Sequence, residues 1–339
     1  MMRLGGVEER TLPGLTHAMR RLKNGFAVQP IYYKDDPECD EAWADRESIH
    51  YGGRKSPGWK QNMEMELVRS GRPVWPMLAD EYHVRTIPRN QYLSSDWAVW
   101  RSLDRGMAHP YCCAWAAVHK NDDKYFFRQM YRRDTPIPII IKQTKDADGE
   151  DEDCCGNVAD SDFWSRDPMG TGGKAFETYA DKFARAGLPL ILADKSKVGY
   201  DTLTEGFFAS VARWALGHQD RGGLDVIREM MGAPTLTAGD IQRIADKPAI
   251  WFHPSCASGA ESLFKQCENL RYREHKNPLH TAAPGMPEDK EDEGPDVVRY
   301  MCQTKAVQWS MPRRENTHDL IEELLAMNAA QAKEVSSWR

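Results

Sequence analysis

The stretch WAVWRSLDRGMAHPYCCAWAAVHKNDDKYFFRQMY, residues 97–131, decides the fold class of this chain. It contains short runs rich in aromatic and small apolar residues at 97–103, 112–119 and 125–131. The segment DRGMAHP separates the first two runs and KNDD separates the last two, and both are rich in residues that form turns. Apolar runs of this length between turns indicate strands, so the stretch predicts an antiparallel meander.

The chain after the meander alternates between strand-like and helical patterns. Short apolar runs predict strands at 157–159, 188–193 and 249–252. The spacing of apolar residues predicts helices at 174–186, 199–216, 224–231, 238–245 and 258–267, with further helices beginning near Pro295 and near Asp319. A meander followed by this alternation predicts an α/β fold, a mixed central sheet flanked by helices.

The beginning and the end of the chain differ from this central part. Residues 1–95 are interrupted by many prolines and glycines and show one convincing helix at 57–70, with Ser56 as its cap and Pro57 at its first position. We therefore divide the chain into an extended N-terminal arm and linker (1–95), a main domain (96–310) and a C-terminal helix or tail (311–339).

Composition excludes several classes of protein. The 339 residues are 41% hydrophobic, enough for a core. The longest wholly apolar stretch, 112–118, is far shorter than the roughly 18 residues of a membrane helix, and MMRLGGVEER lacks the apolar segment of a signal peptide. We expect a cytoplasmic protein with no membrane association. None of the eight cysteines forms a CxxC motif, which argues against a zinc ribbon or a disulfide framework.

Charge is unevenly distributed along the chain. The formal net charge of −6 argues against nonspecific coating of nucleic acid by the whole surface, but it leaves room for a local basic groove. Acidic residues are concentrated in DADGEDED (146–153) and EDKEDE (288–293). Runs of this kind are typical of solvated loops that like-charge repulsion keeps extended.

Several carboxylates stand where strands end or a helix begins. Asp104 and Asp160 each end a strand-like run, and Asp292, Glu293 and Asp296 lie at a predicted helix start, where Asp292 and Asp296 share a face. Converging carboxylates need a cation, and hard ions such as Mg²⁺ or Mn²⁺ prefer oxygen ligands. Two such ions about 4 Å apart can clamp the attacking and leaving oxygens of a phosphodiester. By spacing alone this signal is weak, because a single aspartate at a strand end is more often a turn former or a cap.

Four segments, in the same order along the chain, resemble the nuclease half of the large terminase subunit of tailed bacteriophages. They are WRSLDRGMAHPYCCAWAAV (100–118), VADSDFWSRD (158–167), AGLPLILADKSKVG (186–199) and EDEGPDVVRYM (291–301). The resemblance implies an RNase H-like nuclease domain over 96–310 and a two-metal endonuclease that cleaves concatemeric double-stranded viral DNA during genome packaging.

The resemblance also implies roles for individual residues. It makes Asp104, Asp160 and Asp296 the catalytic, metal-binding aspartates and adds Asp292 and Glu293 as further ligands of two Mg²⁺ or Mn²⁺ ions. Glu293 stands where the family usually has His, and Ser161 stands where Pro usually follows the second Asp. The first departure leaves the division of roles among Asp292, Glu293 and Asp296 open.

The same resemblance bears on cofactors and partners. The sequence has no G-x-x-x-x-G-K-[ST] stretch, and the glycine-rich 170–174 is followed by Ala175. Residues 52–90 resemble the segment that joins motor to nuclease, so we expect a nuclease without an ATP site, either truncated or separate from its motor. The implied partners are double-stranded DNA, the packaging ATPase motor, the small terminase subunit and the portal, in the cytoplasm of the infected bacterial host.

Basic residues could line a DNA groove beside the carboxylates, where phosphate contacts give affinity without sequence preference. Lys195 and Lys197 lie in a loop after a predicted strand, and Arg128 and Arg132 lie in the meander. A solvated surface explains Arg128 and Arg132 at least as well, and Lys195 and Lys197 are the better candidates because their loop follows the sheet toward the Asp160 side. A Holliday-junction resolvase or transposase-type nuclease on the same fold, or a packaging-assembly module with a vestigial centre, remains an alternative. The sequence leaves open the oligomeric state, the cutting preference and the physiological metal.

Overall fold

The computed structural model describes residues 20–21, 27–28, 39–55, 59, 63, 73–105, 110–149, 152–165, 177–195, 198–272, 287, 293–305 and 307. Most of the helix predicted over 57–70, the glycine-rich 170–174 and the helix predicted from Asp319 lie outside these residues. Within them, no helix is long and apolar enough to cross a membrane.

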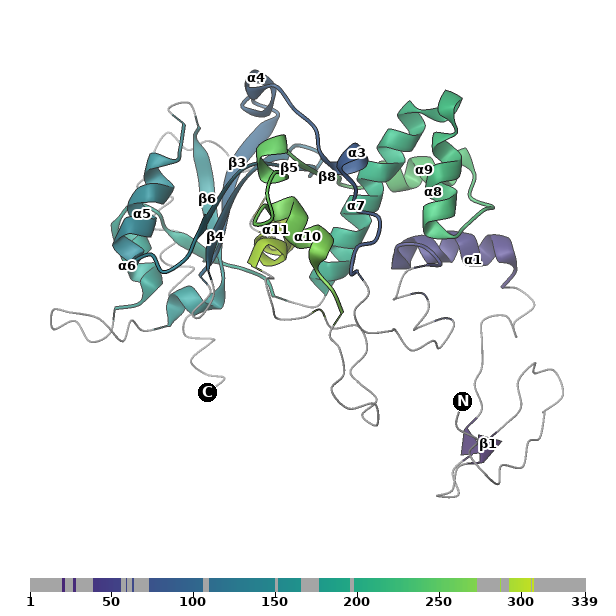
Figure 1. The fold of residues 1–339 in the computed structure, drawn as a ribbon, viewed down its shortest axis with the longest axis horizontal. Helices are drawn as coiled ribbons and strands as arrows, with labels where there is room; N and C mark the ends of the chain where they lie inside the picture. Colours follow the sequence, from purple (N-terminus) through teal and green to yellow (C-terminus); the bar gives the residue numbers. More distant parts are fainter. Residues whose placement is uncertain are drawn as a thin grey trace.

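A six-stranded mixed sheet with the strand order β7-β6-β3-β4-β5-β8 forms the centre of the molecule (Figure 1). Its strands are β3 (Trp97–Asp104), β4 (Tyr111–His119), β5 (Lys124–Arg132), β6 (Cys154–Ala159), β7 (Leu190–Leu192) and β8 (Ile250–Phe252). The first three form the predicted antiparallel meander. β6 is parallel to β3, β7 is parallel to β6, and β8 is parallel to β5. A meander extended from its first strand by two parallel strands is the arrangement of the RNase H-like fold, so the predicted fold class is confirmed.

Helices cover both faces of this sheet. On one face lie α7 (Val198–Gly217), α10 (Leu263–Asn269) and α11 (Glu293–Gln303), and on the other lie α5 (Ile137–Asp146) and α6 (Tyr179–Arg185) (Figure 1). Because both faces are covered, every residue of β3 is buried, which explains why the strand reads as a nearly continuous apolar run. Alternate residues therefore enter two different cores, one on each side of the sheet.

A helical module extends from the side of the sheet. α8 (Gly223–Met231) and α9 (Ala238–Ala245) pack on α7, and α1 (Glu41–Ser48) lies beside them (Figure 1). Asp45 of α1 is 1% exposed and accepts a hydrogen bond of 2.8 Å from the backbone N–H of Thr235. The sequence analysis assigned no helix to 41–48, although Asp40 caps its first turn by accepting from the N–H of Trp43.

Residues 73–95, inside the predicted arm and linker, pack against the domain body. Trp75 Nε1 donates to Thr204 Oγ1 of α7 at 3.1 Å, and the N–H of Ile87 donates to Tyr125 Oη of β5 at 3.0 Å. The short helices of this region and of the connecting loops are α3 (Asp80–His83), α4 (Arg89–Tyr92), η2 (Ile49–Tyr51), η3 (Ser161–Trp164), η4 (Gln219–Arg221) and η5 (Pro254–Cys256), and the remaining strands are β1 (Arg20–Arg21) and β2 (Ala27–Val28). The domain boundary at residue 95 stays a prediction.

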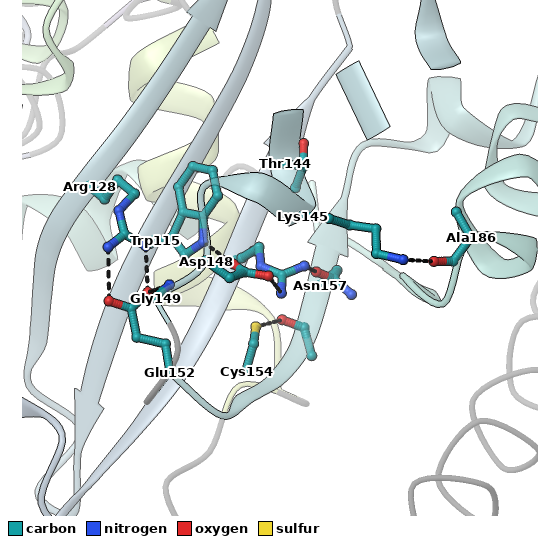
Figure 2. A network of polar contacts seen from close by, with 12 residues as sticks. Trp115, Arg128, Thr144, Lys145, Asp148, Gly149, Glu152, Cys154, Asn157 and Ala186 are labelled. Carbon is teal, nitrogen blue, oxygen red and sulfur yellow. Dashed lines mark hydrogen bonds and ion pairs between the residues drawn. The ribbon is translucent and has the colours of Figure 1, made fainter. Parts of the chain in front are cut away.

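The acidic run 146–153 is not wholly a solvated loop. Asp146 ends α5, and Asp148 accepts hydrogen bonds from Arg101 Nη2 at 2.7 Å and Trp115 Nε1 at 2.9 Å (Figure 2). Arg101 also donates from Nη1 to Asn157 Oδ1 at 2.8 Å. A buried guanidinium and an indole N–H from the sheet bind the Asp148 carboxylate, so like-charge repulsion does not extend this part of the run into solvent.

Candidate active site

Two predicted aspartates meet at one edge of the sheet. Asp104 is the last residue of β3, and Asp160 directly follows β6. Leu103 is paired with Ala159, and the N–H of Asp160 donates to the carbonyl oxygen of Leu103 at 3.1 Å. Neighbouring parallel strands present side chains in register, so both carboxylates point to the same face. The structure thus brings together two residues that lie 56 positions apart in the sequence, as 160 minus 104 gives.

Helix α11 brings Glu293 and Asp296 to that edge. Its position on the sheet is fixed where Ser102 Oγ of β3 donates to the carbonyl oxygen of Val297 at 2.6 Å. Ser102 and Asp104 point to the same face because side chains alternate along a strand. Asp296 therefore lies on the helix that covers the face from which Asp104 and Asp160 project. Its Oδ2 accepts a hydrogen bond of 3.0 Å from Tyr300 Oη, one helical turn further on.

The Tyr300 hydroxyl reports on all three aspartates. Burial raises its pKa most strongly, and the negative charges of Asp296, Asp104 and Asp160 raise it further. All three charges oppose ionisation of this one buried phenol. Tyr300 therefore stays protonated and donates its hydrogen bond to Asp296.

A second buried side chain, on β4, is influenced by the charges of both Asp104 and Glu293. Cys112 of β4 is the register partner of Asp104. Burial raises the pKa of its thiol well above the usual value, and the charges of Asp104 and Glu293 add to this effect. Glu293 is 2% exposed and accepts from Tyr131 Oη at 3.4 Å. Glu293 is thus the fourth carboxylate of the cluster.

Two basic side chains neutralise part of this negative charge. The Lys195 ammonium forms an ion pair with Asp160 Oδ1. Arg299 donates from Nε and Nη2 to Asp296 Oδ1 at 3.1 and 2.8 Å. Burial raises the pKa of Asp296, while the Arg299 charge and the Tyr300 hydrogen bond act in the opposite direction. Lys195 and Arg299 thus each neutralise one carboxylate of the cluster.

The donor set is chemically suited to hard divalent cations. Asp104, Asp160, Glu293 and Asp296 supply only carboxylate oxygens, the ligands that Mg²⁺ and Mn²⁺ prefer. As the side chains stand, no group of three or more His, Cys, Asp or Glu in the described ranges is arranged to hold a metal ion. Lys195 and Arg299 bind two of the carboxylates instead. Asp292 lies outside the described residues.

The basic residues predicted to contact DNA lie in different places. Lys195 is at the carboxylates, and Lys197 lies outside the described residues. Arg132 is exposed and donates from Nε to Gln143 Oε1 of α5 at 2.8 Å. Arg128 belongs to the polar network on the α5 face of the sheet, where it forms a two-pronged ion pair with Glu152 (Figure 2).

Glu152 fully engages the Arg128 guanidinium. Its side chain is 1% exposed and also pairs with Arg89 Nη1 at 3.1 Å. Burial opposes its ionisation, but the hydrogen bonds from Arg128 and the Gly149 N–H outweigh this and lower the pKa of Glu152. A buried, ionised glutamate of this kind needs both arginines as counter-ions. Arg128 therefore stabilises the loop before β6, on the opposite face of the sheet from the one that α11 covers.

Arg299 and Tyr300 belong to the segment 291–301 that carries the resemblance, but no role in the site is predicted for them. Their spacing was informative, because side chains three and four residues after Asp296 lie on the same helical face as Asp296. Both bind its carboxylate in the structure, one from each side.

This chain matches known proteins in a comparison with solved structures. A scan against protein-family models finds no match, and a search of curated proteins also finds none. Solved structures that resemble this chain include large terminases of bacteriophages and their nuclease domains.

Three of these structures illustrate the similarity. The large terminase from a thermophilic bacteriophage has a TM-score of 0.47 and 12% identity, over 81% of this chain and 55% of that one. The P22 large terminase nuclease domain has a TM-score of 0.43 and 12% identity, over 68% and 91%. The g2p nuclease domain from bacteriophage SPP1 with bound Mn has a TM-score of 0.36 and 15% identity, over 64% and 92%. This chain thus spans about half the length of the terminase from the thermophilic bacteriophage.

Proposed function

We propose that this chain is a metal-dependent endonuclease that cleaves concatemeric double-stranded viral DNA during genome packaging, as the nuclease part of a terminase-like large subunit. The observation that carries the proposal is that Asp104 and Asp160 lie at neighbouring parallel strand ends, on the face covered by the helix that bears Glu293 and Asp296. The strand order of the sheet is in keeping with it.

In this proposal Asp104, Asp160 and Asp296 hold two Mg²⁺ or Mn²⁺ ions, with Glu293 and Asp292 as further ligands. Ions bound there would polarise the scissile phosphodiester and supply a nucleophile from water at neutral pH. Arg299 and Tyr300 hold the Asp296 carboxylate in one orientation. Such fixed geometry matters because catalytic groups act efficiently only when they are positioned before the substrate arrives.

The same proposal places DNA over the carboxyl ends of the strands. Lys195, whose side chain is 41% exposed, and Lys197 would contact backbone phosphates there. Arg132, on the α5 face, is a more distant candidate for such a contact. We further propose the packaging ATPase motor, the small terminase subunit and the portal as partners, and the cytoplasm of the infected bacterial host as the location.

Plasmid nicking tests the proposal directly. We expect the full chain to nick supercoiled DNA with Mn²⁺ or Mg²⁺ and not with EDTA. Asp104→Asn and Asp160→Asn should each lower the rate by at least about 100-fold, because a carboxamide is a poor ligand for these cations. Circular dichroism and thermal unfolding check that the variants fold.

Asp220→Asn is the matched control, because Asp220 is 77% exposed in η4 and lies outside the cluster. Nicking by Asp104→Asn at the control's rate would refute the proposed site. A strong preference for branched over linear DNA would instead favour a junction resolvase. Absence of cleavage with every metal, together with affinity for a motor chain, would favour a packaging-assembly module.

A further inference from the structure

A continuous polar connection joins two carboxylates of the candidate site. The Lys195 ammonium binds Asp160, which follows β6. The backbone carbonyl of the same lysine accepts a hydrogen bond of 3.3 Å from Arg299 Nη1. Arg299 in turn binds Asp296 on α11. One lysine after β7 and one arginine of the helix therefore link the sheet side of the cluster to its helix side.

The two cations are held very differently. The Arg299 side chain is 9% exposed, and its guanidinium lies 5.1 Å from the ring centroid of Tyr200 and 5.2 Å from that of Tyr300. The Lys195 side chain is 41% exposed and forms an ion pair with Asp160. A guanidinium fixed by several bonds between aromatic rings has few other positions, whereas an exposed ammonium is strongly hydrated and mobile. Only Lys195 can leave its carboxylate for solvent at low cost.

The negative charge of the cluster makes the mobility of Lys195, compared with Arg299, important for metal binding. Asp104 and Asp160 are 8% and 6% exposed, and buried carboxylates at neighbouring strand ends are costly without a nearby positive charge. Asp160 Oδ1 accepts from Ser161 Oγ at 3.0 Å as well as contacting the Lys195 ammonium, and a divalent cation bound to either oxygen of this carboxylate would repel that ammonium. The cation and Lys195 therefore compete for the Asp160 carboxylate, whereas Arg299 binds Asp296 from within helix α11.

We propose that Lys195 is an exchangeable internal counter-ion, whose ammonium neutralises Asp160 until a divalent cation binds and then moves into solvent. Arg299 is a positioning residue that stays on Asp296 in both conditions. This inference rests on the proposed function, because it concerns the same metal centre. The chain then loses the Lys195–Asp160 ion pair when the centre binds metal, and this loss lowers the affinity of the chain for the metal. Without metal, the same ion pair stabilises the folded cluster.

Metal binding and stability, measured separately from cleavage, test the inference. Mn²⁺ affinity is measured by titration with detection of free Mn²⁺ by electron paramagnetic resonance, and thermal unfolding is measured in EDTA. Lys195→Met should bind Mn²⁺ about fivefold more tightly than the wild type, the size expected for loss of a partly exposed ion pair. The same variant should unfold at a lower temperature than the wild type in EDTA. Lys195→Gln, a polar replacement, provides a second variant if the methionine protein folds poorly.

Two further variants complete the design. Arg299→Met should weaken Mn²⁺ binding by about tenfold or more, because Asp296 loses the group that orients it. Lys142→Met is the matched control, since it removes an exposed Lys142–Asp146 ion pair of α5 and should change neither measurement.

The outcomes separate the inference from the proposed function. Unchanged or weaker Mn²⁺ binding by both Lys195 variants would overturn the exchange of counter-ions while leaving the nuclease proposal in place. A wild-type chain that binds neither Mn²⁺ nor Mg²⁺ would refute the metal-dependent nuclease and the inference with it.

Discussion

A buried histidine makes the stability of the domain sensitive to acid. His83 of α3 is 0% exposed, and its Nδ1 and Nε2 lie 3.1 Å from the carbonyl oxygens of Ala79 and of Phe207 in α7. Burial lowers the pKa of His83 from 6.5 to about 4, although both carbonyl contacts favour the protonated ring. The ring is therefore neutral in the folded chain at neutral pH.

The sign of the effect follows from the direction of the shift. Above pH 6.5 the ring is neutral in both states, so its contribution to the free energy of unfolding is fully present. As the pH falls from 6.5 through 4, the unfolded chain takes up the proton first, and stability is lost. The shift corresponds to about 3 kcal/mol in total, of which about 2 kcal/mol falls between pH 7 and pH 5.

Urea unfolding at pH 7 and pH 5, followed by tryptophan fluorescence, measures this loss. We expect His83→Gln to be less stable than the wild type at pH 7, because it disturbs the packing between α3 and α7. The variant should nevertheless lose about 2 kcal/mol less than the wild type on acidification, since glutamine does not titrate. His50→Gln, which changes an exposed histidine, should lose as much as the wild type. Equal acid sensitivity of His83→Gln and the wild type would refute the reasoning.

Two further predictions concern packing and a buried ion pair. A Cβ at Gly156 of β6 would meet Trp100 Cζ3 at 2.6 Å, so Gly156→Ala should destabilise the fold by about 1–3 kcal/mol in urea unfolding. Adding Trp100→Phe should recover part of that loss, and strictly additive effects would contradict a steric cause. Asp45 is 1% exposed, accepts from Thr235 and pairs with Arg54 Nε at 2.6 Å, so Asp45→Ala should cost about 3 kcal/mol in the same assay. A loss below about 1 kcal/mol would mean that α1 contributes little to the stability of the helical module.

Some elements escaped the sequence analysis because tertiary contacts decide them. Residues 137–146 include three β-branched isoleucines in succession, which gives no clear helical preference. They form α5 because Ile140 enters the core of that sheet face, where Thr144 of the next turn is buried and contacts Tyr111 Oη of β4 at 3.2 Å. The helix predicted from residue 258 begins at Leu263 instead, since Gly259 adopts a positive φ of 89° and Ser262 caps the helix.

The residues of the candidate site also fall into those that the sequence indicates and those that only the tertiary structure identifies. Asp104 and Asp160 could be singled out because each ends an apolar run, and strand ends are where side chains gather at the edge of a sheet. Asp296 could be singled out from its place at the start of a helix, and its two partners lie within one helical turn. Glu152 could not be identified from the sequence as the partner of Arg128, since nothing local to Arg128 indicates that Glu152 becomes buried beside it.

The sequence by itself determined the meander, most of the later strands and helices, and the residue types able to bind a hard cation. These properties depend on neighbours within a few positions, where periodicity and turn residues act directly. Only the tertiary structure decided which carboxylates meet and which cations neutralise them. Strand register and helix docking set those distances, and they join residues as far apart as Ser102 and Val297, for which no local pattern exists.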